Sequence, residues 1–279
     1  MSAFMNILLG GVFHAAVLFL VAAGLQLVFG VQKILNLACG SFYALGAYFG
    51  ITFIAYMTKY GMPPWLLLPA LVLSGLLIGL VGPFIELLLT FAILLMFQDV
   101  FRFLWGANPL QVNVDYLVYG KLTASDFSVP VYNLMVIAAA ILIAAGLGLF
   151  LQKTNYGRVL RATAENRTMA EALGVDVRSI YAVVFTVGTM LGTVAGALVI
   201  PTAAAALEIP GEFIVEAFAV VVIGGLGSMP GALAGALVVG LIHAFSIVIY
   251  PELELLVTYL IVIGVLLFRP AGLFGKPAT

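Results

Sequence analysis

The side chains that could do chemistry gather in one charged stretch, residues 153–178. It holds five of the eleven Lys and Arg residues, namely Lys153, Arg158, Arg161, Arg167 and Arg178. We expect Asn155 to cap a surface helix of about 16 to 18 residues that ends near Gly174. Its charges form pairs four residues apart that share a helix face: Arg161 with Glu165, and Arg167 with Glu171. A turn between two membrane helices needs only a few residues, so this long connection predicts a surface on which a partner docks. The alternative is a helix that lies solvated at the lipid surface.

Other polar side chains inside apolar segments are few: His14, Gln26, Asn36 and His243. A buried polar group in a helical bundle usually bonds to another helix, so we interpret these residues as hydrogen-bond partners rather than ligands. Glu208, Glu212 and Glu216 recur every four residues, and we interpret them as a solvated rim near the outer surface, with a docking face as the alternative. The histidines have no acidic or nucleophilic partner nearby in the sequence, which disfavours a membrane-embedded enzyme.

These observations predict no catalytic residue, no metal site and no bound cofactor in this chain. The pattern Gly-x-x-x-x-Gly-Lys-Ser/Thr is absent from the sequence, so the chain carries no phosphate-binding loop of that kind. Its single cysteine, Cys39, cannot form an intrachain disulfide.

The elements that must position these residues are membrane helices. Of the 279 residues 64% are apolar and 8% charged, with a mean hydropathy of +1.24. Soluble domains are about 45–50% apolar and about 25% charged. The length allows about eight to ten helices that cross a bilayer, which excludes a large soluble catalytic domain. A net charge of -1 argues against binding nucleic acid.

Nine apolar segments are candidate crossings: 7–30, 38–57, 64–82, 87–105, 130–151, 180–200, 212–227, 230–249 and 252–268. Their apolar residues run on without the alternation of a membrane strand, which favours helices over a barrel. The predicted fold is an all-α polytopic membrane protein. It is a bundle of about eight to nine transmembrane helices that forms one domain over residues 1–279.

Orientation follows from the distribution of cations. Loops rich in Lys and Arg stay on the cytoplasmic side, which places 153–178 and the C-terminus there. By the same reasoning the amino terminus and 106–129 lie outside. Apart from Asp99 and Arg102, we expect no charged residue within the membrane. A proton-coupled or sodium-coupled carrier usually needs intramembrane carboxylates, so we expect the energy for transport to enter from a partner at the inner face.

Glycine marks two kinds of position. Pairs four residues apart let helix backbones approach closely: Gly75/Gly79, Gly188/Gly192/Gly196 and Gly231/Gly235. The passages 30–47 and 224–236 are instead rich in both glycine and polar backbone, which is typical of broken or re-entrant helices that line a pathway. The predicted pathway residues are Asn36, Gly40, Ser41, Gly225, Gly227 and Ser228.

Four ordered motifs, 27–48, 157–167, 222–232 and 267–275, resemble the membrane subunits of branched-chain amino acid ABC importers, the LivH type more than the LivM type. The resemblance runs nearly from end to end. It implies a multi-pass permease of the bacterial inner membrane that pairs with a homologous second permease, two cytoplasmic ABC ATPase subunits and an external substrate-binding protein. ATP and Mg²⁺ would then sit on the partner subunits. By this resemblance the residues that match the ATPase-contacting loop are Gly157, Arg158, Arg161, Glu165 and Asn166.

The sequence departs from the resemblance at three places. Relatives commonly carry His where this chain has Cys39 and a cation near Glu216, so no family role passes to either position. They also carry an arginine-rich loop after the residue that matches Glu86, where this sequence turns at 82–90 straight into the next apolar segment. The predicted function is an importer permease, with branched-chain amino acids as the default substrate. The alternative is an ATP-independent channel or ion-coupled carrier for a small polar solute such as urea or an amide.

Overall fold

A computed structural model describes residues 2–33, 36, 38–80, 90–111, 119–124, 127–249, 254–269 and 271–275. Its helices are α1 Ser2–Gln32, α2 Ala38–Lys59, η1 Pro64–Leu66, α3 Leu67–Gly79, α4 Thr90–Trp105, α5 Val131–Lys153, α6 Asn155–Glu165, α7 Arg167–Ala172, α8 Val177–Val199, α9 Ile209–Gly224, α10 Met229–Ile249 and α11 Glu254–Phe268. Each of the nine predicted apolar segments coincides with a helix, since a helix satisfies its own backbone hydrogen bonds where water is absent.

Five helices in the described part of the chain are long and apolar enough to cross a membrane: α1, α2, α5, α8 and α10. The other apolar helices are shorter, with α3 at 13 residues and α11 at 15. A helical membrane protein is therefore confirmed, while the count of eight to nine crossings stays a prediction. The corner at 82–90 falls largely outside the described residues.

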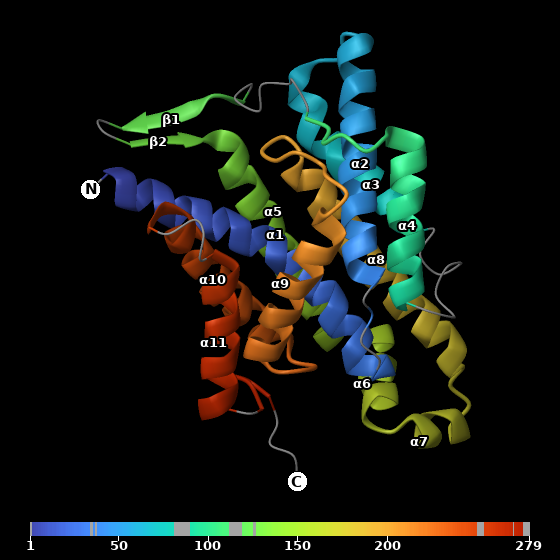
Figure 1. Ribbon diagram of the computed structural model, residues 1–279. Helices are drawn as coiled ribbons and strands as arrows, with labels where there is room; N and C mark the ends of the chain where they lie inside the picture. The colour runs from blue at the N-terminus through green and yellow to red at the C-terminus, as the bar shows by residue number, and fades with distance from the viewer. Residues whose placement is uncertain are drawn as a thin grey trace.

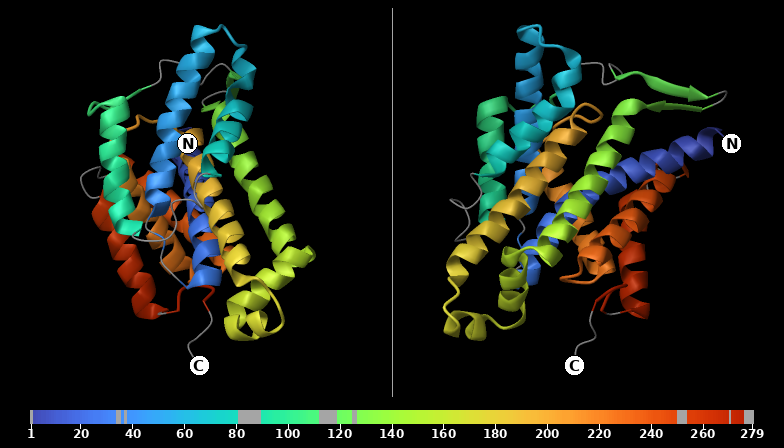
Figure 2. Two further views of the ribbon diagram at one scale, coloured as in Figure 1. Left: turned by 90° about the vertical axis from the view of Figure 1, so that its right-hand side faces the viewer. Right: turned by 180° about the vertical axis from the view of Figure 1, so that it is seen from behind.

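The prediction of an all-α fold is wrong in one loop. The segment predicted to lie outside contains a hairpin of β1 Lys121–Ala124 and β2 Phe127–Pro130, paired antiparallel with Leu122 opposite Val129. Leu, Thr, Val and Phe in these strands favour extended backbone. Figure 2 shows the hairpin and the α6–α7 pair at opposite ends of the bundle.

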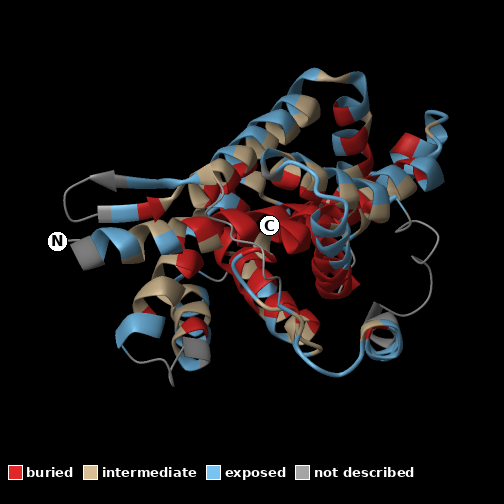
Figure 3. Cartoon of the chain, turned by 90° about the horizontal axis from the view of Figure 1, so that it is seen from above, coloured by how far each residue is buried: buried red, intermediate tan, exposed pale blue. Residues whose placement is uncertain are grey.

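The core lies along α1, which crosses the molecule between α10 on one side and α8 on the other (Figure 1). Seen from above, α1 runs from an exposed start into a centre of buried residues (Figure 3). The stretch 20–23 within it has no exposed surface. Because α1 lies innermost, its few polar side chains must meet partners on neighbouring helices.

The predicted glycine contacts are confirmed as packing sites. A Cβ at Gly196 would overlap the carbonyl oxygen of Tyr43, and one at Gly46 would overlap that of Thr193, so α2 and α8 touch backbone to backbone. Gly75 and Gly79 on α3 likewise meet α8 closely. There the hydroxyls of two threonines donate to the glycine carbonyls, Thr193 to Gly75 at 2.6 Å and Thr189 to Gly79 at 2.9 Å.

Candidate functional site

The charged stretch begins at a tight corner between α5 and α6. The hydroxyl of Thr154 accepts a hydrogen bond from the Gly157 N–H at 3.0 Å and so caps α6. The prediction that Asn155 is the cap is wrong by one residue, because Thr154 has the extended backbone that a cap needs. A Cβ at Gly157 would meet the carbonyl oxygens of Phe150 and Leu151, so the corner closes only around glycine.

The continuous surface helix is also wrong, because Asn166 divides it. This residue is extended, with φ -148° and ψ 97°, and its side chain accepts from the Met169 N–H at 3.0 Å to cap α7. A short polar side chain that bonds to nearby backbone competes with helix continuation, which explains the break. Gly174, at φ +85°, ends the unit as predicted.

Side chains across α6 and α7 are largely exposed, and the docking interpretation stays a prediction. Among the predicted ATPase-contacting residues, Arg158, Arg161, Glu165 and Asn166 are exposed and Gly157 is buried in the corner. Large apolar side chains are exposed beside them: Tyr156 65%, Met169 58% and Leu173 78%. Apolar groups next to a charged rim are typical of a protein interface.

Two arginine side chains make contacts within this unit. Arg167 Nε donates to Glu171 Oε1 at 2.8 Å, which confirms one predicted pair, and the carboxylate raises the pKa of Arg167. Arg161 Nε donates instead to the Gly157 carbonyl at 3.4 Å.

At the start of α8, hydrogen bonds from the Ser179 hydroxyl and N–H hold the pKa of Asp176 below its usual value, so this cap stays ionised at neutral pH.

The second glycine passage forms the turn between α9 and α10, and α1 holds it. Gln26 Nε2 donates to the Gly225 carbonyl at 2.9 Å, and Gln26 Oε1 accepts from the Gly227 N–H at 2.5 Å. Gly225 has φ +98°, which L side chains rarely adopt. The tail pairs here too, since Phe274 N–H donates to the Gly224 carbonyl at 3.0 Å. The motifs 222–232 and 267–275 are thus neighbours in space.

Gln26→Leu removes both side-chain bonds to this turn. It leaves the exposed Gly227 N–H to water and the Gly225 carbonyl with only the bond from the Ser228 N–H, so we expect the free energy of unfolding to fall by about 1 kcal/mol. Thermal unfolding in detergent measures the loss. The matched control is Gln152→Leu at the exposed end of α5. Equal stability of the two variants would show that the bonds contribute nothing.

The remaining predicted pathway residues lie in two groups. Asn36 caps α2 by accepting from the Ala38 N–H at 3.0 Å, and both Asn36 and Ser41 are buried. Within the described residues, Asn36 Nδ2 and Ser41 Oγ have no hydrogen-bond partner. Gly40 packs against Pro210 of α9. Gly225, Gly227 and Ser228 form the turn already described, so their role in a pathway stays a prediction.

The three glutamates before and on α9 do not form one solvated rim. Glu208 and Glu212 are exposed as expected, whereas Glu216 is buried at 7% exposure. Steps of four residues drift by about 40° around a helix, and the second step brings Glu216 against α1 and α10. The prediction of a rim is wrong for Glu216, and so is the expectation that Asp99 and Arg102 are the only charged residues within the bundle.

Both histidines converge on Glu216, contrary to the prediction that they lack an acidic partner. His14 Nε2 lies 3.0 Å from Glu216 Oε2, and His243 Nδ1 lies 3.6 Å from Glu216 Oε1. The two imidazole rings are stacked with centroids 3.9 Å apart, and the His14 ring also meets Phe213 edge-on. Residues 202 apart in the sequence meet here, so spacing gave no signal for the cluster.

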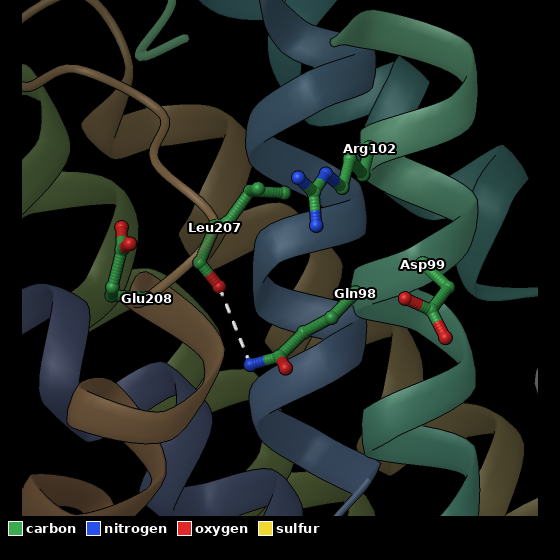
Figure 4. A pocket seen from close by; sticks show the side chains of 5 residues that line it. All are labelled: Gln98, Asp99, Arg102, Leu207 and Glu208. Atoms are coloured by element: carbon green, nitrogen blue, oxygen red, sulfur yellow. Dashed lines mark hydrogen bonds between the residues drawn. The ribbon is translucent and has the colours of Figure 1, made fainter. Parts of the chain in front are cut away.

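A separate polar pocket of about 180 Å³ lies between α4 and the segment before α9. It is lined by Gln98, Asp99, Arg102, Leu207 and Glu208 (Figure 4). Gln98 Nε2 donates to the Leu207 carbonyl at 3.4 Å, which ties the two walls together. Composition singled out Asp99 and Arg102 as charges in an apolar run, but nothing in the sequence placed Glu208 beside them. The pocket combines one cation with two carboxylates.

Comparison with known proteins gives consistent matches along the chain. The profile of the family described as "branched-chain amino acid transport system, permease component" matches residues 7–266. The high-affinity branched-chain amino acid transport permease BraD of Pseudomonas aeruginosa is 27% identical over 92% of this chain and 91% of its own length. The corresponding LivH of Escherichia coli K12 is 26% identical over 98% of this chain and 96% of its own. A probable LivH of Methanocaldococcus jannaschii is 28% identical over 96% and 92%. No solved structure matches.

The alignments are longer than the chain. That with the Escherichia coli LivH runs over 308 positions, whereas this chain has 279 residues. The relative therefore carries residues with no counterpart here. The absence of the relatives' arginine-rich loop after Glu86 stays a prediction.

Proposed function

This chain belongs to the family of branched-chain amino acid transport system permease components, and from that premise we propose that it is the permease subunit of a binding-protein-dependent ABC importer. It forms half of a translocation pathway for branched-chain or related amino acids. The observation that carries the proposal is a family match that spans the bundle and the charged α6–α7 pair together. The chain catalyses no covalent reaction.

The proposed partners are a homologous second permease, two cytoplasmic ABC ATPase subunits and an external substrate-binding protein. The chain is a multi-pass protein of the inner membrane, and we place α6, α7 and the C-terminus in the cytoplasm. The C-terminal end of α11 lies at the same end of the bundle as α6 and α7, which supports this orientation (Figure 1). ATP and Mg²⁺ are bound by the ATPase subunits rather than by this chain.

In the mechanism we propose, closure of the ATPase subunits on ATP moves the α6–α7 pair. ATP acts because its affinity differs between the two states of the assembly. The capped helices α6 and α7 then transmit the displacement into the bundle as a rigid unit. The corner at Gly157 joins that unit directly to α5, and Asp176 joins its other end to α8. Movement of two long helices then opens the pathway to one side and closes it to the other.

The pocket of Figure 4 supports a zwitterionic substrate. The Arg102 guanidinium can receive an α-carboxylate, since its fork of donors matches that geometry. Asp99 or Glu208, which lie on opposite sides of the pocket, can receive an α-ammonium. The charges therefore match the two ends of an amino acid better than they match an uncharged amide.

The test is uptake into vesicles that hold the chain together with its partner permease and ATPases. We expect uptake to need ATP, and a triple variant Arg158→Ala, Arg161→Ala and Glu165→Ala to lose at least about tenfold of the ATPase activity that the loaded binding protein stimulates. Charged groups across an interface govern encounter and register, which is why their loss uncouples the two partners. ATPase stimulation unchanged by the triple variant would contradict coupling through α6.

An ion-coupled carrier is the second candidate, because Glu216 is the buried carboxylate that such carriers use. The same vesicles distinguish the two functions. Vesicles without ATP receive a proton gradient, and the importer takes up no substrate under that condition. Uptake driven by the gradient alone would establish the carrier.

A further inference from the structure

We propose that His14, Glu216 and His243 form a binding site for a divalent first-row transition-metal ion, with Zn²⁺ as the best fit. Each ligand comes from a different helix, α1, α9 and α10 respectively. Their ligand atoms all lie within 4.8 Å of one another. Two imidazoles and one carboxylate are a common ligand set for zinc, with the fourth position left open to water.

The distances suit a tetrahedral ion. Two ligand atoms at bond lengths of about 2.0–2.1 Å from zinc lie about 3.3 Å apart. His14 Nε2 lies 3.0 Å from Glu216 Oε2, and His243 Nδ1 lies 3.6 Å from Glu216 Oε1. These two separations, each to a different carboxylate oxygen, fall on either side of that value. Because a metal ion lies in the plane of each imidazole that holds it, the two stacked rings must tilt apart. Rotation of the histidine side chains about χ2 supplies this movement without moving a helix.

Charge balance gives a second reason. A carboxylate buried in an apolar bundle is costly unless it is paired. In the part of the chain that the structure describes, the salt-bridge partners of Glu216 are His14 and His243, and no Lys or Arg is among them. A divalent cation would neutralise the carboxylate and keep both imidazoles in the neutral form that binds metal.

The sequence adds a third reason. The chain contains two histidines, and both reach the same carboxylate. The His14 side chain is 21% exposed, which gives an ion a route to the cluster. The His14 ring also meets Phe213 edge-on, with ring centroids 6.2 Å apart, so the cluster has an apolar neighbour. A metal ion bound here would join α1, α9 and α10, so it favours whichever transport state brings the three helices together.

The experiment measures metal binding by the full chain, purified in detergent without a polyhistidine tag. We expect one Zn²⁺ per chain by equilibrium dialysis and elemental measurement. Co²⁺ as the probe should give the visible absorption of a tetrahedral site. Zn²⁺ should also raise the unfolding temperature. Glu216→Gln should weaken binding by at least about tenfold, since even loss of an outer-shell group costs that much.

The controls separate a lost ligand from a damaged fold. Glu212→Gln changes an exposed carboxylate one turn away on α9 and should bind Zn²⁺ like the parent. Unfolding curves recorded without metal first show whether His14→Gln and His243→Gln are folded. The folded variants should lose the Co²⁺ spectrum. Binding that does not saturate at one ion per chain would overturn the proposal. Unchanged affinity in folded Glu216→Gln would overturn it as well.

Discussion

Gly196→Ala is expected to lower the free energy of unfolding by about 3 kcal/mol, because one added methyl group forces α2 and α8 apart. A Cβ at this position would overlap the backbone carbonyl oxygen of Tyr43 and lie 3.1 Å from the Ala47 nitrogen. Backbone atoms cannot rotate away as a flexible side chain does. The loss is large against the roughly 5–15 kcal/mol that stabilises a typical domain.

The same contact has a second glycine, which makes the prediction more specific. Gly46 on α2 faces the Thr193 carbonyl on α8, so each helix offers one glycine to the other. Without a hydrophobic drive for association in lipid, close backbone approach supplies much of the attraction between such helices. Gly46→Ala should therefore destabilise the bundle to a similar degree. The double variant should give no more than twice the single loss, because both changes relax the same interface.

Thermal unfolding and the yield of monodisperse protein in detergent measure this effect. The matched control is Gly10→Ala on α1, where a Cβ meets nothing within 4 Å. That change should leave stability equal or raise it, by up to about 1 kcal/mol, because alanine favours helix more than glycine does. If Gly196→Ala unfolded at the temperature of the control, the backbone contact between α2 and α8 would not exist.

The sequence was sufficient to place the apolar helices and to identify the glycines at which they approach one another closely. Continuous apolar runs have one stable arrangement in lipid, so segments such as 38–57 and 230–249 could be placed within a few residues. Glycine spacing identified Gly75 and Gly196 as contact positions because a four-residue step keeps side chains on one face. The hairpin of β1 and β2 was missed because its strands are only four residues long and lie in a connection between helices.

The neighbours of each helix could not be predicted from the sequence. Glu216 was assigned to a solvated rim because the only signal in the sequence was its four-residue spacing from Glu212. Its burial depends on α1 and α10, which pack against that face of α9. The pocket needed Arg102 and Glu208, which are remote in sequence, to meet across two elements. At Asn166 a local signal existed, since asparagine often caps a helix, but the surrounding helix-forming residues outweighed it.

Gly157→Val is expected to reduce ATP-driven uptake at least about tenfold while the bundle stays folded. The added atoms would meet the carbonyl oxygens of Phe150 and Leu151, so α6 must swing away from the end of α5. The α6–α7 pair then no longer presents Arg158 and its neighbours in the position that the proposed ATPase contact needs. Substrate-loaded binding protein should then no longer stimulate ATP hydrolysis. A displaced α6 would contact the ATPase no differently in the two states of the transporter, so it could not couple them.

Gly148→Val is the matched control, since a Cβ there meets nothing within 4 Å and the residue lies on α5, about two turns before the corner. Uptake and unfolding temperature should both match the parent in this variant. In Gly157→Val the unfolding temperature should shift by only a few degrees, because the corner lies at the edge of the core rather than within it. Full uptake by a folded Gly157→Val chain would show that the α5–α6 corner does not transmit the ATPase movement. In that event α8, entered through the Asp176 cap, would be the remaining route from α7 into the bundle.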